Sequence, residues 1–260
     1  MRTRAEIAGE RTTKSGCCHE NARVRREELR YLGWRVTCPL CSGRFREFAP
    51  DRWDGSRWFG DPARCPRCGS LPRHRFLRLF LAQAELLRNG DDVLHVAPEP
   101  RIGPWIDKQV RRYVTMDIEP GAAEVVADVT ALPFPDAAFD LVICSHVLEH
   151  VPDDAAALRE LRRVLRTGGA AVVQTPVNYD QAETFEDASV TDPAERMRLF
   201  SQHDHVRVYG RDFGQRLGSA GFTVSVQDAA DLDAHMIDRF GLAPRVGPLR
   251  NDIYLAVASD

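Results

Sequence analysis

The chain has 260 residues, of which 43% are hydrophobic and 28% charged, and its formal net charge is -3 at pH 7. This length suits one large domain or a medium domain with a small module, and the composition excludes a disordered or membrane-embedded chain. No segment has the ~18 consecutive apolar residues of a membrane span, and residues 1–16 lack the apolar stretch of a signal peptide. We therefore expect a cytoplasmic protein that does not partner a membrane.

The charge is unevenly distributed. The first 75 residues hold 17 Lys+Arg against 9 Asp+Glu, or +8, and the remainder hold 18 against 29, or -11. A basic front favours an anionic partner such as RNA. However, only Lys14 and Lys108 are lysines, so the arginine excess runs through the whole chain and is not a site signal by itself. Docking of RNA on this basic front therefore stays as an alternative.

Residues 1–34 are expected to form a helical or mobile N-terminal segment, with a helix over 20–32. Within it, Cys17, Cys18 and His19 are adjacent, and three adjacent side chains cannot converge on one ion without partners from elsewhere. The seven cysteines are an odd number in a chain without a secretion signal, which disfavours a disulfide framework.

Four cysteines have the spacing of a metal site. Cys38 and Cys41 form one C-x2-C pair, and Cys65 and Cys68 form a second pair 23 residues later. Two such turns can supply four thiolates in the tetrahedral arrangement that zinc prefers, and a closed shell of four thiolates indicates a structural ion. Residues 35–72 are thus predicted to be a small zinc-ribbon module, with iron as the chemical alternative.

Residues 73–260 are predicted to form an α/β domain. The segment 73–90 has the apolar periodicity of a helix that stops at Asn89-Gly90. Strands and helices then alternate, which indicates a doubly wound, mostly parallel, seven-stranded Rossmann-like sheet. The predicted strands are 93–97, 113–117, 124–128, 139–145, 170–175, 222–227 and 253–257, and the predicted helices are 102–110, 153–166 and 211–220.

In such a sheet the ligand lies beyond the carboxyl ends of the strands. The first strand ends at Ala97, the second at Asp117, the third at Asp128 and the fourth at Ser145. Asp117 lies 20 residues after Ala97, close to the spacing at which a carboxylate accepts both hydroxyls of a ribose. This spacing predicts a cofactor that contains a nucleoside.

The segments VLHVAPEP, YVTMDIEP, VADVTALPFPDAAFDLVICSHVLEHV and LRTGGAAVVQTPV resemble the class I S-adenosylmethionine-dependent methyltransferases. The resemblance is strong over residues 92–177, weak toward the end, and nearest to the type-11-like branch. It implies S-adenosylmethionine as cofactor. It also implies cofactor contacts from Ala97, Glu99, Asp117, Ile118, Asp128, Val129, Ser145 and His146, with His150 nearby.

The chain departs from this family in its first loop. Where the family has G-x-G-x-G, this chain has Ala97, Glu99 and Arg101. Because glycine adopts positive φ without cost, we expect a different and stiffer turn here. Glu99 is expected to take the ammonium group of the cofactor, and His95 to be a hydrogen-bonded core imidazole. The missing glycines also leave open a non-catalytic, methyltransferase-like binding protein.

The insertion 178–209 is predicted to cover the acceptor. If it is extended, His203, His205, Arg207 and Tyr209 share one face, since alternate residues of an extended chain point the same way. Attack by a hydroxyl needs a base, so we assign His205 as the base, with His146 and His150 as further catalytic candidates. A second metal held by His203, Asp204 and His205 is a chemical alternative. The predicted acceptor is an oxygen of a small molecule or sugar, and the sequence leaves the oligomeric state open.

Overall fold

The computed structural model describes residues 28–51, 63–242 and 249–259. Cys17, Cys18, His19 and most of the helix predicted over 20–32 lie outside these residues. Residues 28–31 are helical and are followed at once by strand β1 (Leu32–Thr37), which begins three residues before the predicted module boundary at 35.

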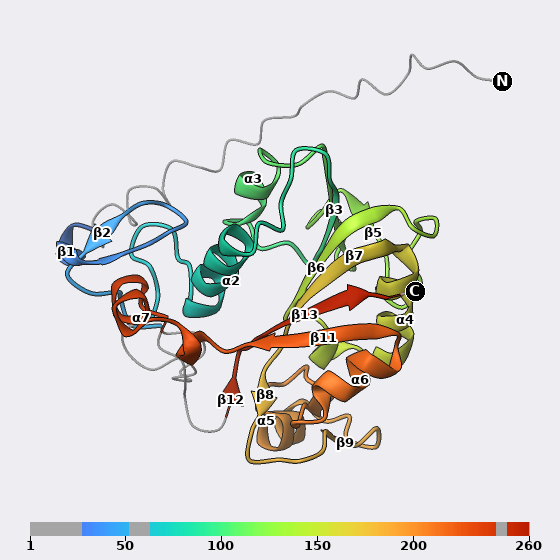
Figure 1. Cartoon of the computed structure of the whole chain (residues 1–260). Coiled ribbons are helices and arrows are strands. Elements are labelled where there is room, and N and C mark those ends of the chain that lie inside the picture. Colours follow the sequence, from blue (N-terminus) through green and yellow to red (C-terminus); the bar gives the residue numbers. More distant parts are fainter. Residues whose placement is uncertain (1–27, 52–62, 243–248, 260) are drawn as a thin grey trace.

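A seven-stranded sheet forms the centre of the molecule, in the order β11-β13-β7-β6-β3-β4-β5 (Figure 1). β3, β4, β5, β6 and β7 are parallel, whereas β13 runs antiparallel to both β7 and β11. This confirms the predicted doubly wound α/β fold. The strands are β3 (Asp92–Val96), β4 (Arg112–Asp117), β5 (Val125–Val126), β6 (Phe139–Ser145), β7 (Leu165–Gln174), β11 (Phe222–Gln227) and β13 (Ile253–Ala258).

Both faces of the sheet are apolar, because both are covered by helices. In β6, Val142 and Cys144 face one core, while Leu141 and Ile143 face the other. The first core packs against α4 (Asp154–Val164) and α6 (Phe213–Ser219), and the second against α2 (Pro72–Gln83) and α3 (Gly103–Ile106). The period of two in a continuous apolar strand thus places residues in two cores at once.

Helix α2 ends earlier than predicted. It stops at Gln83 rather than at Asn89-Gly90, because Glu85 adopts a left-handed conformation with φ of 50°. The N–H of Leu86 then donates to the carbonyl of Leu81, the six-to-one bond that closes a helix C-terminus. A glutamate fills the position where glycine is usual, so the sequence carried no stop signal there.

Short elements complete the chain. Helix α3 spans four residues, fewer than predicted, and α7 (Ala234–Phe240) was not predicted. Paired short strands are β1 with β2 (Arg44–Phe45), β8 (Val177–Asn178) with β12 (Leu249–Arg250), and β9 (Phe185–Glu186) with β10 (Arg207–Val208). The remaining elements are α5 (Pro193–Phe200) and the 3-10 turns η1 (Leu148–His150) and η2 (Ala229–Asp231). Within the described residues, no helix is long and apolar enough to span a membrane.

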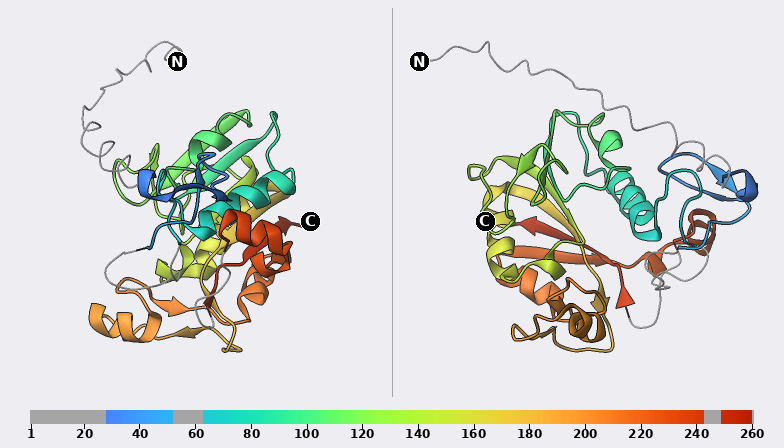
Figure 2. Two further views of the ribbon diagram at one scale, coloured as in Figure 1. Left: turned by 90° about the vertical axis from the view of Figure 1, so that its left-hand side faces the viewer. Right: turned by 180° about the vertical axis from the view of Figure 1, so that it is seen from behind.

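A buried arginine joins three parts of the molecule. The Arg75 side chain, on α2, is fully buried and donates to the carbonyls of Ser70, Phe240 and Gly241 at 2.7, 2.7 and 2.6 Å. Its guanidinium carbon lies 3.9 Å from the centre of the Phe48 ring. Ser70 and Phe48 belong to the cysteine-rich module, and Phe240 ends α7, which lies beside that module in all views (Figures 1 and 2).

Gly241 is required at this junction. It has φ of +57°, and a Cβ there would lie 2.4 Å from the Phe48 ring. Both the backbone conformation and the close approach therefore favour glycine.

We expect Arg75→Met to lower the free energy of unfolding by about 3 to 5 kcal/mol, because it leaves buried carbonyl groups without a donor. Chemical denaturation followed by circular dichroism measures this. Arg198→Met is the matched control, since the ion pair of Arg198 with Glu195 is exposed and screened by solvent, so its loss should leave stability nearly unchanged. A loss below about 1 kcal/mol in Arg75→Met would contradict the structural role given to this side chain.

Candidate functional site

The first loop after β3 contains a residue in the left-handed backbone conformation that is not a glycine. Ala97, directly after β3, has φ of 48°, and its N–H donates to the carbonyl of Met116 at 2.7 Å. His146, directly after β6, also has positive φ, 55°. The expectation of a different turn is therefore only partly right, since the chain accepts the strain of a Cβ at the first glycine position. Such strained residues gather where a fold positions a ligand.

Glu99 follows this turn and is held by a buried histidine. His95 is fully buried and lies 2.8 Å from the Glu99 carboxylate through Nε2 and 2.8 Å from the Tyr113 hydroxyl through Nδ1. Burial alone would raise the pKa of Glu99, but the hydrogen bond and charge of His95 outweigh it and hold the pKa at about 2. His95 is thus the bonded core imidazole that was predicted, and Glu99 is an ionised carboxylate at the strand edge.

Two further carboxylates that solvent can reach follow: Asp117 ends β4, and Asp128 lies two residues after β5, which is shorter than the predicted strand 124–128. Asp117 is half-buried and accepts from the N–H of Glu119 through Oδ1, and the neighbouring Ile118 side chain is 66% exposed. Asp128 is exposed and accepts from Thr130, while Val129 is buried. Both carboxylates are thus open to a ligand at the carboxyl edge of the sheet.

Beyond β6, Glu149 is buried and linked to two neighbours. It is 2% exposed, accepts from the Thr175 hydroxyl at 2.9 Å, and lies 3.1 Å from Nδ1 of His146. Burial opposes the ionisation of Glu149, but the close imidazole of His146 outweighs it and lowers the pKa of the carboxyl to about 2. Burial, aided by the charge of Arg73, lowers the pKa of His146. Sequence reasoning did not assign Glu149, although it lies between the two histidines of the HVLEHV segment.

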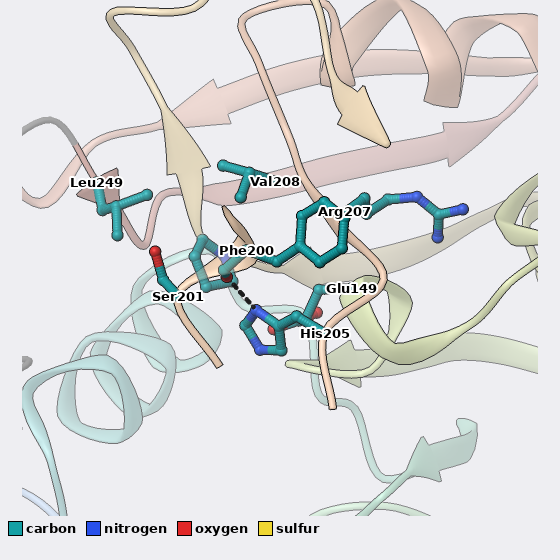
Figure 3. A pocket seen from close by; sticks show the side chains of 8 residues that line it. Glu149, Phe200, Ser201, His205, Arg207, Val208 and Leu249 are labelled. Atoms are coloured by element: carbon teal, nitrogen blue, oxygen red, sulfur yellow. Dashed lines mark hydrogen bonds between the residues drawn. The ribbon is translucent and has the colours of Figure 1, made fainter. Parts of the chain in front are cut away.

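Three side chains meet beside this point. Potential ligand atoms of Glu149, His150 and His205 all lie within 4.8 Å of one another. The rings of His150 and His205 contact edge to face with centres 4.7 Å apart. Glu149 and His205 also line a small pocket that is open to solvent, with Phe200, Ser201 and Leu249 on its wall (Figure 3).

His205 is buried and fixed in place. Its Nδ1 lies 3.2 Å from the carbonyl of Phe200, and burial lowers the pKa of the imidazole to about 4. His203, by contrast, is exposed, so the expectation that it shares a face with His205 is wrong. Residues 201–204 turn, and only from His205 does the chain run toward β10. Among the described residues, the close metal-ligating group is accordingly not His203, Asp204 and His205, as suggested, but Glu149, His150 and His205.

Arg207 and Tyr209 do share the buried face with His205, and they hold the segment beside it. The Arg207 guanidinium donates to the carbonyls of Leu148, Val151 and Pro152, and Nε binds Glu186 at 2.8 Å. The Tyr209 hydroxyl donates to Asp154 at 2.8 Å. The helix predicted from the PAERMRLF stretch is present as α5. The insertion is therefore packed onto the edge of the sheet where Glu149 and His150 lie.

The start of α2 adds two side chains that sequence reasoning did not assign, Arg73 and His74. Arg73 is half-buried; desolvation lowers its pKa, although the charges of Glu99 and Glu149 oppose that shift. The Nδ1 of His74 accepts from the N–H of Leu71 and caps the helix. The R-H-R stretch was a usable signal, since it follows the second cysteine pair and opens the helix.

The four cysteines converge. Their sulfur atoms lie within 4.8 Å of one another, with Cys38 and Cys68 3.6 Å apart and Cys41 and Cys65 3.7 Å apart.

The two cysteine turns have the same hydrogen bonds. In each, the first cysteine accepts from the N–H four residues on, Ser42 or Gly69, and donates to the carbonyl five residues on, Gly43 or Ser70. Ser42 and Gly69 both have positive φ, 56° and 72°. Phe45 and Phe48 pack between the turns, while Trp53, Trp58 and Phe59 lie outside the described residues. This donor set and geometry fit a tetrahedral zinc ion.

Residues 84–173 match the profile of a family described as a methyltransferase domain. Demethylmenaquinone methyltransferase from Mycolicibacterium vanbaalenii is 36% identical over 133 residues, which are 45% of this chain and 58% of that protein. Among solved structures, 1,6-didemethyltoxoflavin-N1-methyltransferase from Burkholderia thailandensis has a TM-score of 0.51 and 18% identity, over 73% of this chain and 79% of its own. The cyclase SpnF has a TM-score of 0.51 and 18% identity, over 78% and 85%.

The sheet order and the family match over residues 84–173 together indicate a domain similar to the methyltransferases. The chain spans 58% of the length of the curated relative named above. The two solved structures show the fold alone, and their names denote different reactions. The fold therefore does not identify the reaction, which must be argued from the site.

Proposed function

We propose that this protein transfers a methyl group from S-adenosylmethionine to an oxygen of a small molecule. The observation that carries the proposal is the row of groups at the carboxyl edge of a sheet with this strand order, namely Glu99, Asp117, Asp128 and Glu149 with His205. The demethylmenaquinone named for the curated relative supports a small-molecule acceptor over a macromolecule.

The residues present fit the cofactor. Asp117 would bind the ribose hydroxyls, Ile118 would cover the base, and Asp128 with Val129 would meet its amino edge. At the other end, the ionised Glu99 would pair with the ammonium group, and the half-buried Arg73 would offer a positive charge for the carboxylate. Ser145 and His146 would flank the sulfur. When bound, S-adenosylmethionine supplies a methyl group activated by its sulfonium charge.

The chain's own groups would prepare the acceptor. An alcohol is a weak nucleophile unless a neighbouring group takes or stabilises its proton. His205 lies in the wall of the pocket, and its lowered pKa keeps the imidazole neutral near pH 7, which is the form that accepts a proton. The assignment of His205 as base, with His146 and His150 beside it, remains a prediction.

Asp117→Ala is expected to weaken S-adenosylhomocysteine binding by about 1.5 to 3 kcal/mol, because charge-assisted hydrogen bonds to two hydroxyls are lost. Titration calorimetry measures the affinity. Asp228→Ala serves as control, since Asp228 caps η2 and pairs with Arg250, away from these strand ends. Equal affinity in Asp117→Ala and the unaltered protein would remove the ribose assignment.

His205→Ala is expected to lower turnover by ~10² to 10⁴ with cofactor affinity nearly unchanged, because the residue serves the acceptor. Single-turnover methyl transfer to a responsive acceptor measures the first quantity and calorimetry the second. His203→Ala, which alters an exposed histidine of the same loop, is the matched control. If His205→Ala abolishes S-adenosylhomocysteine binding, the residue has no acceptor role.

We further propose one structural zinc ion bound by Cys38, Cys41, Cys65 and Cys68. Cys65→Ser should lose this ion and unfold the module while α2 to α6 keep their helix content, since the sheet has its own two cores. Elemental analysis and circular dichroism measure the two effects. Cys144→Ser is the control, because Cys144 lies in β6 and not in the cluster. Retention of the full metal content by Cys65→Ser would refute the assignment.

A further inference from the structure

The cluster of Glu149, His150 and His205 has the composition of a metal site with open positions. It contains one carboxylate and two imidazoles, with potential ligand atoms within 4.8 Å of one another. Ligands ~2.1 Å from one ion lie about 3 to 4 Å apart, so small side-chain rotations would complete the geometry. Glu149 and His205 are 2% and 5% exposed, and an ionised carboxylate at such depth needs a compensating charge.

The hydrogen bonds of the two histidines orient them as ligands. Nδ1 of His205 faces the carbonyl of Phe200 at 3.2 Å, and Nδ1 of His150 faces the carboxylate of Asp204 at 3.2 Å. A histidine that binds a metal almost always donates its other ring nitrogen to a carbonyl or carboxylate. Both contacts use Nδ1, which leaves Nε2 of each ring for an ion.

The supports of the cluster are rigid. The N–H of Val206 donates to the carbonyl of Glu149 at 2.9 Å, which ties the histidine of the insertion to the glutamate of η1. Arg207 binds three carbonyls of residues 148–152, and Thr175 holds the second oxygen of Glu149. When neighbouring groups already hold the ligand side chains in place, little conformational entropy is lost on binding an ion.

We propose that Glu149, His150 and His205 bind a divalent transition-metal ion of the zinc, iron or cobalt type, with its open positions facing the pocket. Two imidazoles with one carboxylate suit these ions, whereas magnesium prefers oxygen ligands and water. This site is separate from the four cysteines, whose closed sulfur shell offers no open position. The alternative ligand His203 is exposed and lies outside the cluster.

The role of this ion rests on the proposed methyl transfer, although its binding does not. An acceptor hydroxyl coordinated to the ion would lose its proton more readily, as metal-bound water does. The O–H bond breaks, its electron pair stays on the oxygen beside the ion, and the proton leaves to water. The His146 ring lies beside the cluster, with Nδ1 3.1 Å from Glu149, and its Nε2 is buried without a hydrogen-bond partner among the described residues. With the ion bound, His205 serves the acceptor as a ligand rather than as the base.

The test is a count of cobalt ions in the full chain. Protein exchanged into Co²⁺ and freed of excess metal should hold two ions, one giving the charge-transfer absorption of thiolate ligands and one without it. Glu149→Gln and His150→Ala should each hold one ion and keep the thiolate absorption. His150→Ala is the safer variant for folding because its side chain is 31% exposed. His203→Ala should keep both ions.

A single cobalt ion with thiolate absorption in the unaltered protein would overturn the proposal, and so would two ions in both Glu149→Gln and His150→Ala. S-adenosylhomocysteine affinity is measured on the same samples. If the unaltered protein does not bind S-adenosylhomocysteine, the proposed methyl transfer is refuted. The ion count would still decide the metal site.

Discussion

The position of Arg75 determines how the parts of this protein are joined. A guanidinium placed in a fully buried location must satisfy its donors, and here it does so with carbonyls of the cysteine-rich module and of α7. The planar fork of arginine makes this possible in a way that lysine would not. Its charge also lies close enough to the four sulfur atoms for their negative charge to raise its pKa, against the larger effect of burial. One side chain thus couples the module, the sheet and the C-terminal helix.

A second constraint is the parallel sheet, which brings chemically different residues to one edge. The ends of β3, β4 and β6 place Glu99, Asp117 and the HVLEHV segment side by side, although up to 50 residues separate them. This arrangement strains the backbone at Ala97 and His146, which both adopt positive φ. The insertion then folds back on this edge, because Arg207 and Tyr209 bind η1 and the start of α4.

Much of this arrangement was predictable from local pattern. The alternation of apolar strands with helices predicted the sheet, and the spacing within each cysteine pair predicted the convergence of the four sulfurs. Both signals depend on residues that are close in sequence. The end of α2 was missed because Glu85 takes a left-handed conformation with no glycine to mark it. Glu149 was missed because two of its three neighbours, Thr175 and His205, are distant in sequence. The burial of Arg75 could not be predicted, because the sequence contains many arginines and only tertiary contacts distinguish this one.

The link between the module and the site passes through the first turn of α2. Cys68 and Pro72 are four residues apart, so the position of the second cysteine turn sets where α2 begins. Arg73 and Arg75 lie in that turn, one influenced by Glu99 and Glu149 and the other by the cysteine sulfurs. A closed four-sulfur site has no position for a substrate, so any influence on the reaction must pass through structure. Because a buried arginine cannot move without losing its acceptors, the module holds α2, and through Arg73 it fixes a positive charge at the edge where the cofactor is proposed to bind.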